Sequence, residues 1–405
     1  MQKPRIAILH YAAPPTIGGV EATIAAHARL FAENRYPVRI IAGRGELFDP
    51  RVRVEIIADA GSIGPRVSEV NAELAQGIVS ERFHTLTRDL SQALAPSLAD
   101  CDVLIVHNAL SLHKNLALTA ALKKLSETRR LKFIAWCHDF AWSDPQYAGD
   151  LHPGFPYELL KQPWAGVKYV VVSAARKEDL FNLWQTPAEI AVVPAGIAPC
   201  EFLGVTRQMA DWVDHLALRD AAPLLLLPAR LTRRKNIEYA IEITAALRAR
   251  AWNAKLVVTG PPGPHNPTNI EYLERLRMLR KMRGVEAAVI FLHDYGTVDD
   301  AMRRDLFLLA DALLFPSERE GFGIPLLEAG LTRLPIFCAD LPPFRASALE
   351  HAHYFAHDDA PDGVAARISE YLSRDSAYQL KQRVLQEYGW ERIFSEYIEP
   401  LVIGG

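Results

Sequence analysis

The chain has 405 residues, half of them hydrophobic, and a formal net charge of −3. This length predicts two or three domains, and the composition excludes a largely disordered chain. A slightly acidic balance argues against a protein that holds nucleic acid by bulk positive charge, so we expect no nucleic-acid partner.

The cysteines and the apolar runs bear on the compartment. Cys101, Cys137, Cys200 and Cys338 lie far apart in the sequence, which fits neither a zinc knuckle nor a dense disulfide framework. The first apolar run, Ile6–Leu9, is too short for the core of a signal peptide, and no run approaches the ~18 apolar residues of a membrane span. We therefore expect a cytoplasmic protein.

Short apolar runs alternate with helical patterns along the chain. The expected strands of the first half are Arg5–His10, Val38–Ile41, Val52–Ile57, Val103–His107, Phe133–Cys137 and Tyr169–Val172. Those of the second half are Leu224–Leu227, Leu256–Thr259, Val289–Leu292, Ala312–Phe315 and Ile336–Cys338. Their nearly continuous hydrophobicity is typical of parallel strands buried on both faces. We predict an α/β fold with two Rossmann-like, doubly wound domains.

The helical patterns and the domain boundary follow from the same alternation. Residues 236–250 illustrate a helix, because their apolar side chains fall on one stripe. We expect domains at residues 1–200 and 217–384, joined by an ordered segment that contains Trp212. Residues 61–90 do not fit the alternation and are interpreted as an insertion.

The sharpest motif runs from Glu320 to Glu328 and directly follows an expected strand. Its glycines permit a tight turn, and Pro325 suits the first position of a helix. The amides of Phe322, Gly323 and Ile324 would then point out of a helix N-terminus, which favours an anion. Two carboxylates beside such a site would hold hydroxyl groups. The alternative is an ordinary strand–turn–helix with solvated glutamates.

A second motif, from Arg230 to Lys235, lies between an expected strand and a helix. Cations at a helix N-terminus are disfavoured by the helix dipole by ~0.3–1 kcal/mol each. A basic cluster there is easier to explain when it holds an anion, although a solvated basic turn is the alternative.

Weaker signals lie after other strands, where ligands of open α/β sheets bind. Gly18 and Gly19 follow the first strand, and Gly260 follows another, before two prolines. His138 also ends a strand. A lone histidine in such a place is more often structural, but an imidazole can take up or orient a proton.

Together these motifs resemble the retaining GT-B glycosyltransferases of family four, over most of the chain and more strongly in its second half. The resemblance implies two Rossmann-like domains that face each other across a cleft. It places the nucleotide donor mainly on the second domain and the acceptor on the first. The last segment, residues 385–405, resembles the helix that packs back on the first domain.

The resemblance also assigns roles within the carboxyl-terminal motifs. Glu320 would contact the transferred sugar, and Glu328 would hold the ribose. Arg230 and Lys235 would clamp the diphosphate, and the amides of residues 322–324 would meet the sugar and the distal phosphate. Asn236 stands where the family usually has glycine, which puts the geometry of this loop in doubt.

For the remaining candidates the implied roles are less specific. Gly18 and Gly19 would approach the donor phosphates and the acceptor, and His138 would touch the donor sugar. Gly260 would let the nucleotide pass close to the backbone, although the prolines after it depart from the family pattern.

The resemblance thus predicts retaining transfer of a hexose from a UDP- or GDP-sugar to a hydroxyl of a small polar metabolite or glycan. Cationic side chains and amides would replace a divalent metal, so we expect no metal and no cofactor. Membrane-surface contact through the basic run Arg275–Arg283 is a less favoured option. The alternatives are a nucleotide-sugar epimerase, a phosphorylase or a non-catalytic nucleotide-sugar-binding protein.

Overall fold

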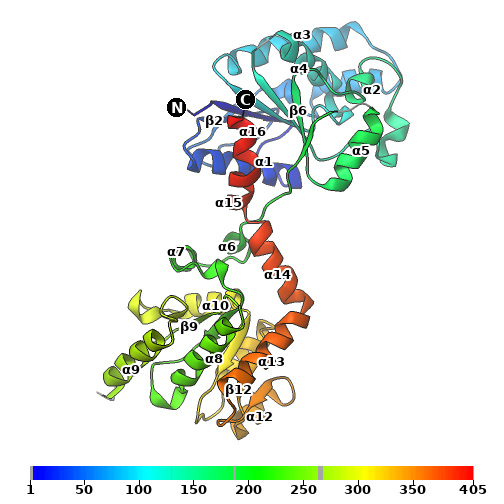
Figure 1. Ribbon diagram of the computed structural model, residues 1–405. Coiled ribbons are helices and arrows are strands. Elements are labelled where there is room, and N and C mark those ends of the chain that lie inside the picture. Colours follow the sequence, from blue (N-terminus) through cyan, green and yellow to red (C-terminus); the bar gives the residue numbers. More distant parts are fainter. Residues whose placement is uncertain (1–2, 129, 186–187, 263–267, 405) are drawn as a thin grey trace. The chain divides into compact units, whose positions relative to one another are not determined.

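A computed structural model describes residues 3–128, 130–185, 188–262 and 268–404. The chain divides into two compact units (Figure 1). The amino-terminal unit comprises Met1–Ile197 and Tyr388–Gly405, and the carboxyl-terminal unit comprises Ala198–Glu387. These limits lie three residues from the expected boundaries at residues 200 and 384. The segment at residues 200–217 belongs to the second unit, where Trp212 lies in the hydrophobic core.

The described strands of the amino-terminal unit form one parallel sheet in the order β3-β2-β1-β4-β5-β6-β7. Their bounds are β1 Ile6–His10, β2 Val38–Ala42, β3 Arg53–Ile56, β4 Val103–His107, β5 Lys132–Cys137, β6 Val167–Val171 and β7 Ile190–Val192. The described α-helices that follow the strands are α1 Gly19–Glu33, α2 Pro65–Leu74, α3 Glu81–Ser97, α4 Leu116–Thr128 and α5 Ala174–Trp184.

Both faces of this sheet are covered, as the continuous hydrophobicity predicts. Successive side chains of a strand point to opposite faces. Ile6 and Ile8 of β1 accordingly pack in a core cluster with α1, whereas Ala7 and Leu9 pack in a second cluster with α3 and α4. The prediction of a doubly wound sheet is therefore confirmed for this unit.

The poor fit of residues 61–90 has a simple cause. Two helices, α2 and α3, lie between β3 and β4, so the strand–helix alternation contains an additional helix there. Val67, Val70 and Leu74 of α2 lie in the same core cluster as α3 and α4. The Tyr157 hydroxyl donates a hydrogen bond to the Leu74 carbonyl at 3.0 Å, which ties α2 to the loop after β5.

The last described segment completes the amino-terminal unit. It consists of α15 Trp390–Ile393, the π-helical turn η8 Phe394–Ile398 and α16 Glu399–Ile403, drawn in red beside α1 in Figure 1. The Phe394 ring centre lies 5.2 Å from that of Phe31 of α1, and the Tyr36 hydroxyl donates to Glu399 Oε1 at 2.6 Å.

The carboxyl-terminal unit holds a second parallel sheet, with its described strands in the order β10-β9-β8-β11-β12-β13. Their bounds are β8 Leu224–Leu227, β9 Lys255–Val258, β10 Val289–Phe291, β11 Ala312–Phe315, β12 Ile336–Ala339 and β13 His353–Phe355. The described α-helices are α6 Pro199–Phe202, α7 Arg207–His215, α8 Ile237–Ala249, α9 Thr268–Met282, α10 Asp300–Leu309, α11 Ile324–Leu331, α12 Pro342–Ala348, α13 Pro361–Arg374 and α14 Ser376–Glu387. Helix α8 packs against α13, and one apolar cluster fills the unit.

Two described strands, β7 and β13, were absent from the sequence-based prediction. Each has three residues and lies at an edge of its sheet, where one side is left unpaired. An exposed histidine, His353, opens β13, so the apolar run that marks a buried strand is missing. Among the helices in the described part of the chain, none is long and apolar enough to cross a membrane.

The contact between Gly196 and Trp390 gives a test of how the last segment is held. A Cβ atom added at Gly196 would lie 2.4 Å from Cδ2 of the Trp390 indole. We expect Gly196→Ala to lower the unfolding free energy of the amino-terminal unit by ~1–3 kcal/mol, because the ring has to move. Denaturant titration measures this change. Gly149→Ala, where the added atom meets open space, is the matched control. Equal stability of the two variants would show that Trp390 does not pack here.

Candidate functional site

The parallel sheet of the carboxyl-terminal unit brings three separated motifs to the edge formed by the carboxyl ends of its strands. Arg230 and Lys235 follow β8, Gly260 follows β9 and Glu320 follows β11. Strand β8 lies between β9 and β11, and the order of the strands reverses at the pair β8–β11. Ligands of open α/β sheets bind outside the carboxyl ends of the strands at such a reversal.

Lys235 and Glu320 are in direct contact across this reversal. Lys235 Nζ donates a hydrogen bond to Glu320 Oε1, and Arg234 Nη1 lies 3.1 Å from Glu320 Oε2. The Lys235 and Glu320 side chains are only 10% and 12% exposed. Burial lowers the pKa of Lys235, against the opposing effect of Glu320. Burial alone would raise the pKa of Glu320, but chiefly the hydrogen bond and charge of Lys235, with a smaller contribution from Arg234, bring that pKa below its usual value.

The loop between β8 and α8 keeps the geometry that a glycine would allow. Asn236 has a φ of 51° and a ψ of 50°, in the left-handed region. Asparagine is among the few residues other than glycine that adopt this conformation readily. The departure from the family pattern at this position therefore does not disturb the turn that carries Lys235.

Gly260 is needed because two loops meet at its backbone. Its amide donates to the Ala229 carbonyl at 3.0 Å, and a Cβ atom there would lie 2.7 Å from Arg230 Cα. The loops after β8 and β9 are thus packed closely behind Arg230, which is exposed.

The loop from Glu320 to α11 ends in an open helix N-terminus. Gly323 has a φ of 99°, and an added Cβ would lie 2.8 Å from the Phe344 ring, so only glycine fits. In the described part of the chain, the amides of Phe322, Gly323 and Ile324 donate to no carbonyl or side chain. Helix α11 begins at Ile324, which makes Pro325 its second residue and not its first.

Glu328 lies one position further along α11 than it would if Pro325 were the first residue of the helix. It is the fifth residue of α11, beyond the first turn, because the left-handed Gly323 lets the helix begin before Pro325. Arg303 Nη1 of α10 donates to Glu328 Oε1 at 2.5 Å. The other oxygen, Oε2, is buried and has no hydrogen-bond partner among the described residues.

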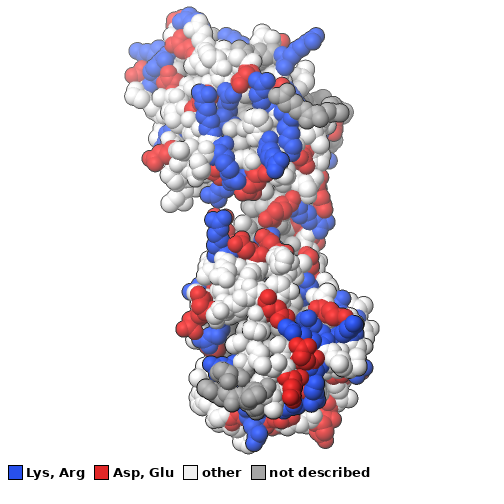
Figure 2. Space-filling model, turned by 90° about the vertical axis from the view of Figure 1, so that its left-hand side faces the viewer, with Lys and Arg blue, Asp and Glu red and all other residues white. Residues whose placement is uncertain are grey.

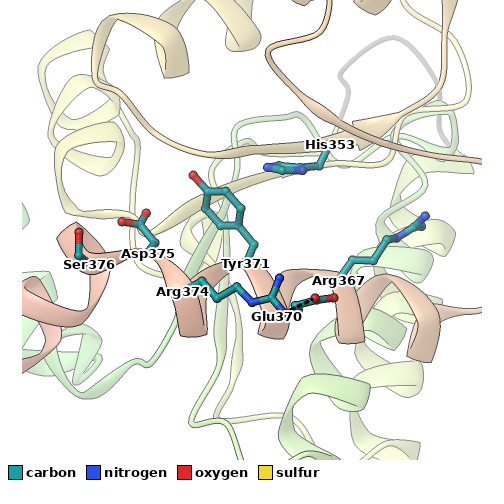
Figure 3. A pocket seen from close by; sticks show the side chains of 7 residues that line it. All are labelled: His353, Arg367, Glu370, Tyr371, Arg374, Asp375 and Ser376. Carbon is teal, nitrogen blue, oxygen red and sulfur yellow. Dashed lines mark ion pairs between the residues drawn. The ribbon is translucent and has the colours of Figure 1, made fainter.

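A hollow lies at the amino end of β13, on the side of the sheet opposite to the carboxyl ends of the strands (Figure 3). It is separate from the candidate residues described above. It is bounded by His353, the first residue of β13, and by residues near the end of α13. Its charges pair with neighbours, since Arg374 lies 2.9 Å from Glu370 and Arg367 lies 2.5 Å from Asp359.

The remaining candidates lie in the amino-terminal unit, after β1 and β5. Gly18 precedes α1, and a Cβ atom there would lie 2.1 Å from Glu21 Oε2, so the glycine leaves room for this carboxylate. Gly19 faces open space. His138 follows β5, and its amide donates to Asn108 Oδ1 at 2.8 Å.

His138 belongs to a cluster of four histidines that the sequence analysis did not detect. His107 Nδ1 lies 3.0 Å from His138 Nε2, His10 Nδ1 lies 3.0 Å from the His107 carbonyl, and the His27 ring centre lies 5.6 Å from that of His107. Burial lowers the pKa of His27 to about 3 and that of His138 to about 4. Burial likewise lowers the pKa values of His10 and His107, so the cluster is uncharged at neutral pH.

The candidate residues thus form two groups, one in each unit. Sequence reasoning also missed two partners, Arg234 of Glu320 and Arg303 of Glu328. Arg234 lies inside the basic motif that was singled out. No sequence signal connects Arg303 with Glu328, because they lie on successive helices.

The charged surface agrees with the small net charge. On the face drawn in Figure 2, Lys and Arg side chains lie beside Asp and Glu side chains in both units, with wide uncharged stretches between them. Many of these side chains form ion pairs, for example Arg66 with Asp59 at 2.7 Å and Arg250 with Asp362 at 2.8 Å.

Comparison with known proteins agrees with the motifs. Residues 209–390, which include all the candidates of the carboxyl-terminal unit, match the family described as Glycosyl transferases group 1. The match lies in the carboxyl-terminal unit and spans less than half of the chain. This match confirms the resemblance to GT-B glycosyltransferases, and the two Rossmann-like domains agree with the predicted GT-B fold. Retention of the anomeric configuration stays a prediction.

Three similar proteins illustrate the range of this group. The serotype-specific mannosyltransferase WbdA of Escherichia coli is 40% identical over 76 residues, which cover 19% of this chain and 9% of that protein. The mannosylglucosylglycerate synthase of Petrotoga mobilis is 25% identical over 61% of each chain. The solved structure of a glycosyltransferase from Rickettsia africae is 14% identical, with a TM-score of 0.37 and complete coverage of both chains. This chain covers less than two thirds of the length of both named relatives.

The buried histidines predict how the stability of this protein responds to acid. A histidine in the unfolded chain has a pKa of about 6.5, so the unfolded state binds protons that His27 and His138 do not bind in the folded state. The free energy of unfolding should be highest above about pH 6.5. Below that pH it should fall by up to about 1.4 kcal/mol per pH unit for each histidine that stays neutral.

Denaturant titrations at about pH 7 and about pH 5 measure this loss. His27→Phe should reduce the difference between the two values, because one neutral buried histidine is removed. His84→Phe, at an exposed position on α3, should leave the difference unchanged. A pH dependence that is identical in His27→Phe and the unaltered protein would contradict the assignment.

Proposed function

We propose that this chain transfers a hexose from a nucleoside diphosphate sugar, with UDP or GDP as the nucleotide, to a hydroxyl group of an acceptor with retention of anomeric configuration. The observation that carries the proposal is the gathering of Arg230, Lys235, Glu320 and the unpaired amides of residues 322–324 at one sheet edge. Anion-binding groups and a buried carboxylate there suit a diphosphate joined to a sugar.

The positive groups match the charge that develops in the reaction. When the sugar–phosphate bond breaks, negative charge collects on the diphosphate and positive character on the sugar ring. Lys235, Arg230 and the amides would stabilise the diphosphate, and preorganised donors of this kind are worth about 10²–10³ in rate each. Because these groups supply the countercharge, we propose that transfer needs no divalent metal.

The ion pair between Lys235 and Glu320 is proposed to change when the donor binds. Lys235 would donate a hydrogen bond to the diphosphate in addition to, or in place of, the one to Glu320. Arg234 would remain in contact with Glu320. Glu320 Oε1 would then accept a hydrogen bond from a sugar hydroxyl. The unpartnered Oε2 of Glu328 suits a ribose hydroxyl, since a buried acceptor without a donor is costly.

Retention follows when the acceptor attacks the face from which the phosphate leaves. The bond between the anomeric carbon and the phosphate oxygen breaks, and a bond to the acceptor oxygen forms. The acceptor proton passes to the departing phosphate. Mannose is the first sugar to test, because both named relatives carry mannosyl in their names.

The acceptor is proposed to bind in the amino-terminal unit, in a hollow on the carboxyl side of β3, β4 and β5. It is lined by Ser62, Asn71, His113, Lys114, Asp150 and Tyr157, among others. The insertion helix α2 provides one wall. Lys114 and Asp150 carry opposite charges, and His113 Nε2 lies 3.7 Å from Asp150 Oδ2. A hollow with balanced charges and several hydrogen-bonding groups suits a neutral acceptor that is rich in hydroxyls.

The donor site is tested by Lys235→Ala and Glu320→Gln. Each should lower kcat for sugar transfer at least about tenfold and up to about 10³-fold, because each removes a group that acts on developing charge. Transfer from radiolabelled UDP- and GDP-sugars measures the change, with and without a chelator. The matched controls, Arg374→Ala and Glu370→Gln, alter an ion pair at the opposite sheet edge and should leave kcat unchanged.

Binding of the nucleotide gives an independent measurement. A nucleoside diphosphate at 100 times its Kd should raise the unfolding free energy by about 2.7 kcal/mol, and Lys235→Ala should weaken this effect. Near-normal turnover in both Lys235→Ala and Glu320→Gln would overturn the site. Failure of UDP and GDP to stabilise the protein would overturn the choice of donor.

The acceptor hollow is tested by Asp150→Asn and Lys114→Met. Loss of a hydrogen bond to a charged group typically costs about 1.5–3 kcal/mol, so KM for the acceptor should rise about tenfold or more. Hydrolysis of the donor without acceptor should be unchanged. Asp179→Asn, on α5 beside Arg176, is the control. An unchanged KM in both variants would place the acceptor elsewhere.

A further inference from the structure

Three histidines of the amino-terminal unit form a connected chain across adjacent strands. His10 ends β1, His107 ends β4 and His138 follows β5, and these strands are neighbours in the sheet. His10 Nδ1 lies 3.0 Å from the His107 carbonyl, and His107 Nδ1 lies 3.0 Å from His138 Nε2. The second contact joins two ring nitrogens. One of them must therefore carry a hydrogen and donate the hydrogen bond, and the other must accept it.

Both rings are uncharged, because burial lowers the pKa of each and the neighbouring histidines add to the effect. A neutral imidazole has one N–H and one acceptor nitrogen. Two arrangements are therefore possible. Either His107 Nδ1–H donates to His138 Nε2, or His138 Nε2–H donates to His107 Nδ1.

The surroundings of His107 decide between them. The ring is fully buried, and its Nε2 has no hydrogen-bond partner among the described residues. If His138 were the donor, the proton of His107 would have to sit on this enclosed Nε2. Among the buried backbone groups of proteins, an N–H without an acceptor is rarer than an under-satisfied acceptor, and we apply the same preference to the ring. The proton of His107 therefore lies on Nδ1, and His107 donates to His138.

This arrangement determines which nitrogen His138 offers to a ligand. Its Nε2 is occupied as an acceptor, so its proton lies on Nδ1. In the described part of the chain, no group bonds to His138 Nδ1, and the side chain is partly exposed. The backbone of the residue is held by Asn108, which accepts from the amides of His138 at 2.8 Å and Asp139 at 3.4 Å.

We propose that His107 is a positioning residue that holds His138 with its proton on Nδ1, so that His138 donates a hydrogen bond to an oxygen of a sugar that binds at the carboxyl ends of β1, β4 and β5. The ligand in this statement rests on the proposed function, whereas the arrangement of protons does not. His138 then acts as a neutral hydrogen-bond donor in transfer and not as the base that removes the acceptor proton.

Nitrogen NMR of the full chain with ¹⁵N-labelled histidine tests the proton positions directly. His138→Gln identifies the His138 signals by their absence. In the unaltered protein, His138 Nε2 should appear as an unprotonated acceptor and Nδ1 as a protonated nitrogen. His107→Phe keeps a ring of similar size but removes the donor, so the proton of His138 should move to Nε2. His107→Asn keeps an amide donor near the position of Nδ1 and should preserve the original form.

Transfer assays on the same variants supply the second readout. His107→Phe should lower kcat by about tenfold to a hundredfold with a smaller change in KM, since a misplaced catalytic group costs rate. His107→Asn should restore most of the loss. A merely structural His107 would make both variants fail alike, with no change in the nitrogen signals of His138.

Each result bears on one statement. A proton on Nε2 of His138 in the unaltered protein would overturn the proposal, even if His107→Phe failed to fold. An unchanged His138 in a folded His107→Phe would overturn it as well. Expected nitrogen signals without sugar transfer by the unaltered protein would refute the proposed function but uphold His107 as the residue that orients His138.

Discussion

Parallel pairing of strands that are buried on both faces is the constraint on which both units depend. A strand such as β8, with four leucines and no polar side chain, has no place for chemistry along its length. Polar groups can stand only beyond its ends, and parallel pairing carries the ends of all strands to the same edge. Residues as distant as Lys235 and Glu320 meet because β8 and β11 are paired, and the buried contact between them follows from that pairing.

The fold was predictable wherever burial leaves a mark on the sequence. Runs such as Leu224–Leu227 and Ala312–Phe315 coincide with strands, since burial on both faces excludes polar residues. The edge strand β13 carries no such mark, since it opens on an exposed histidine, whereas β7 is a short apolar run that the prediction passed over. The apolar stripe predicted a helix at residues 236–250, and α8 spans Ile237–Ala249. The start of α11 could not be predicted in this way, because it depends on the left-handed backbone conformation of Gly323, which residue types alone do not specify.

The candidate site was predictable residue by residue but not contact by contact. Lys235 and Glu320 each stood out in a local motif, and nothing local indicated that they form an ion pair. Arg303 reaches Glu328 from another helix, a long-range contact without a periodic signal. His107 is different, because it is the last residue of an apolar strand, just as His138 directly follows one. A search for polar residues that end buried strands would have found it.

The connectivity of the chain has a consequence for its biosynthesis. Phe394 and Ile398 lie in the hydrophobic core of the amino-terminal unit, on a segment that is translated after the whole carboxyl-terminal unit. Domains usually fold as units during synthesis, with the first one formed earliest. In this chain the amino-terminal unit cannot complete its folding first. It cannot bury Phe31 and Tyr36 fully until residues 388–404 have left the ribosome. The amino-terminal unit is thus completed only after the carboxyl-terminal unit has been translated, and a nascent chain keeps an apolar surface near α1 until then.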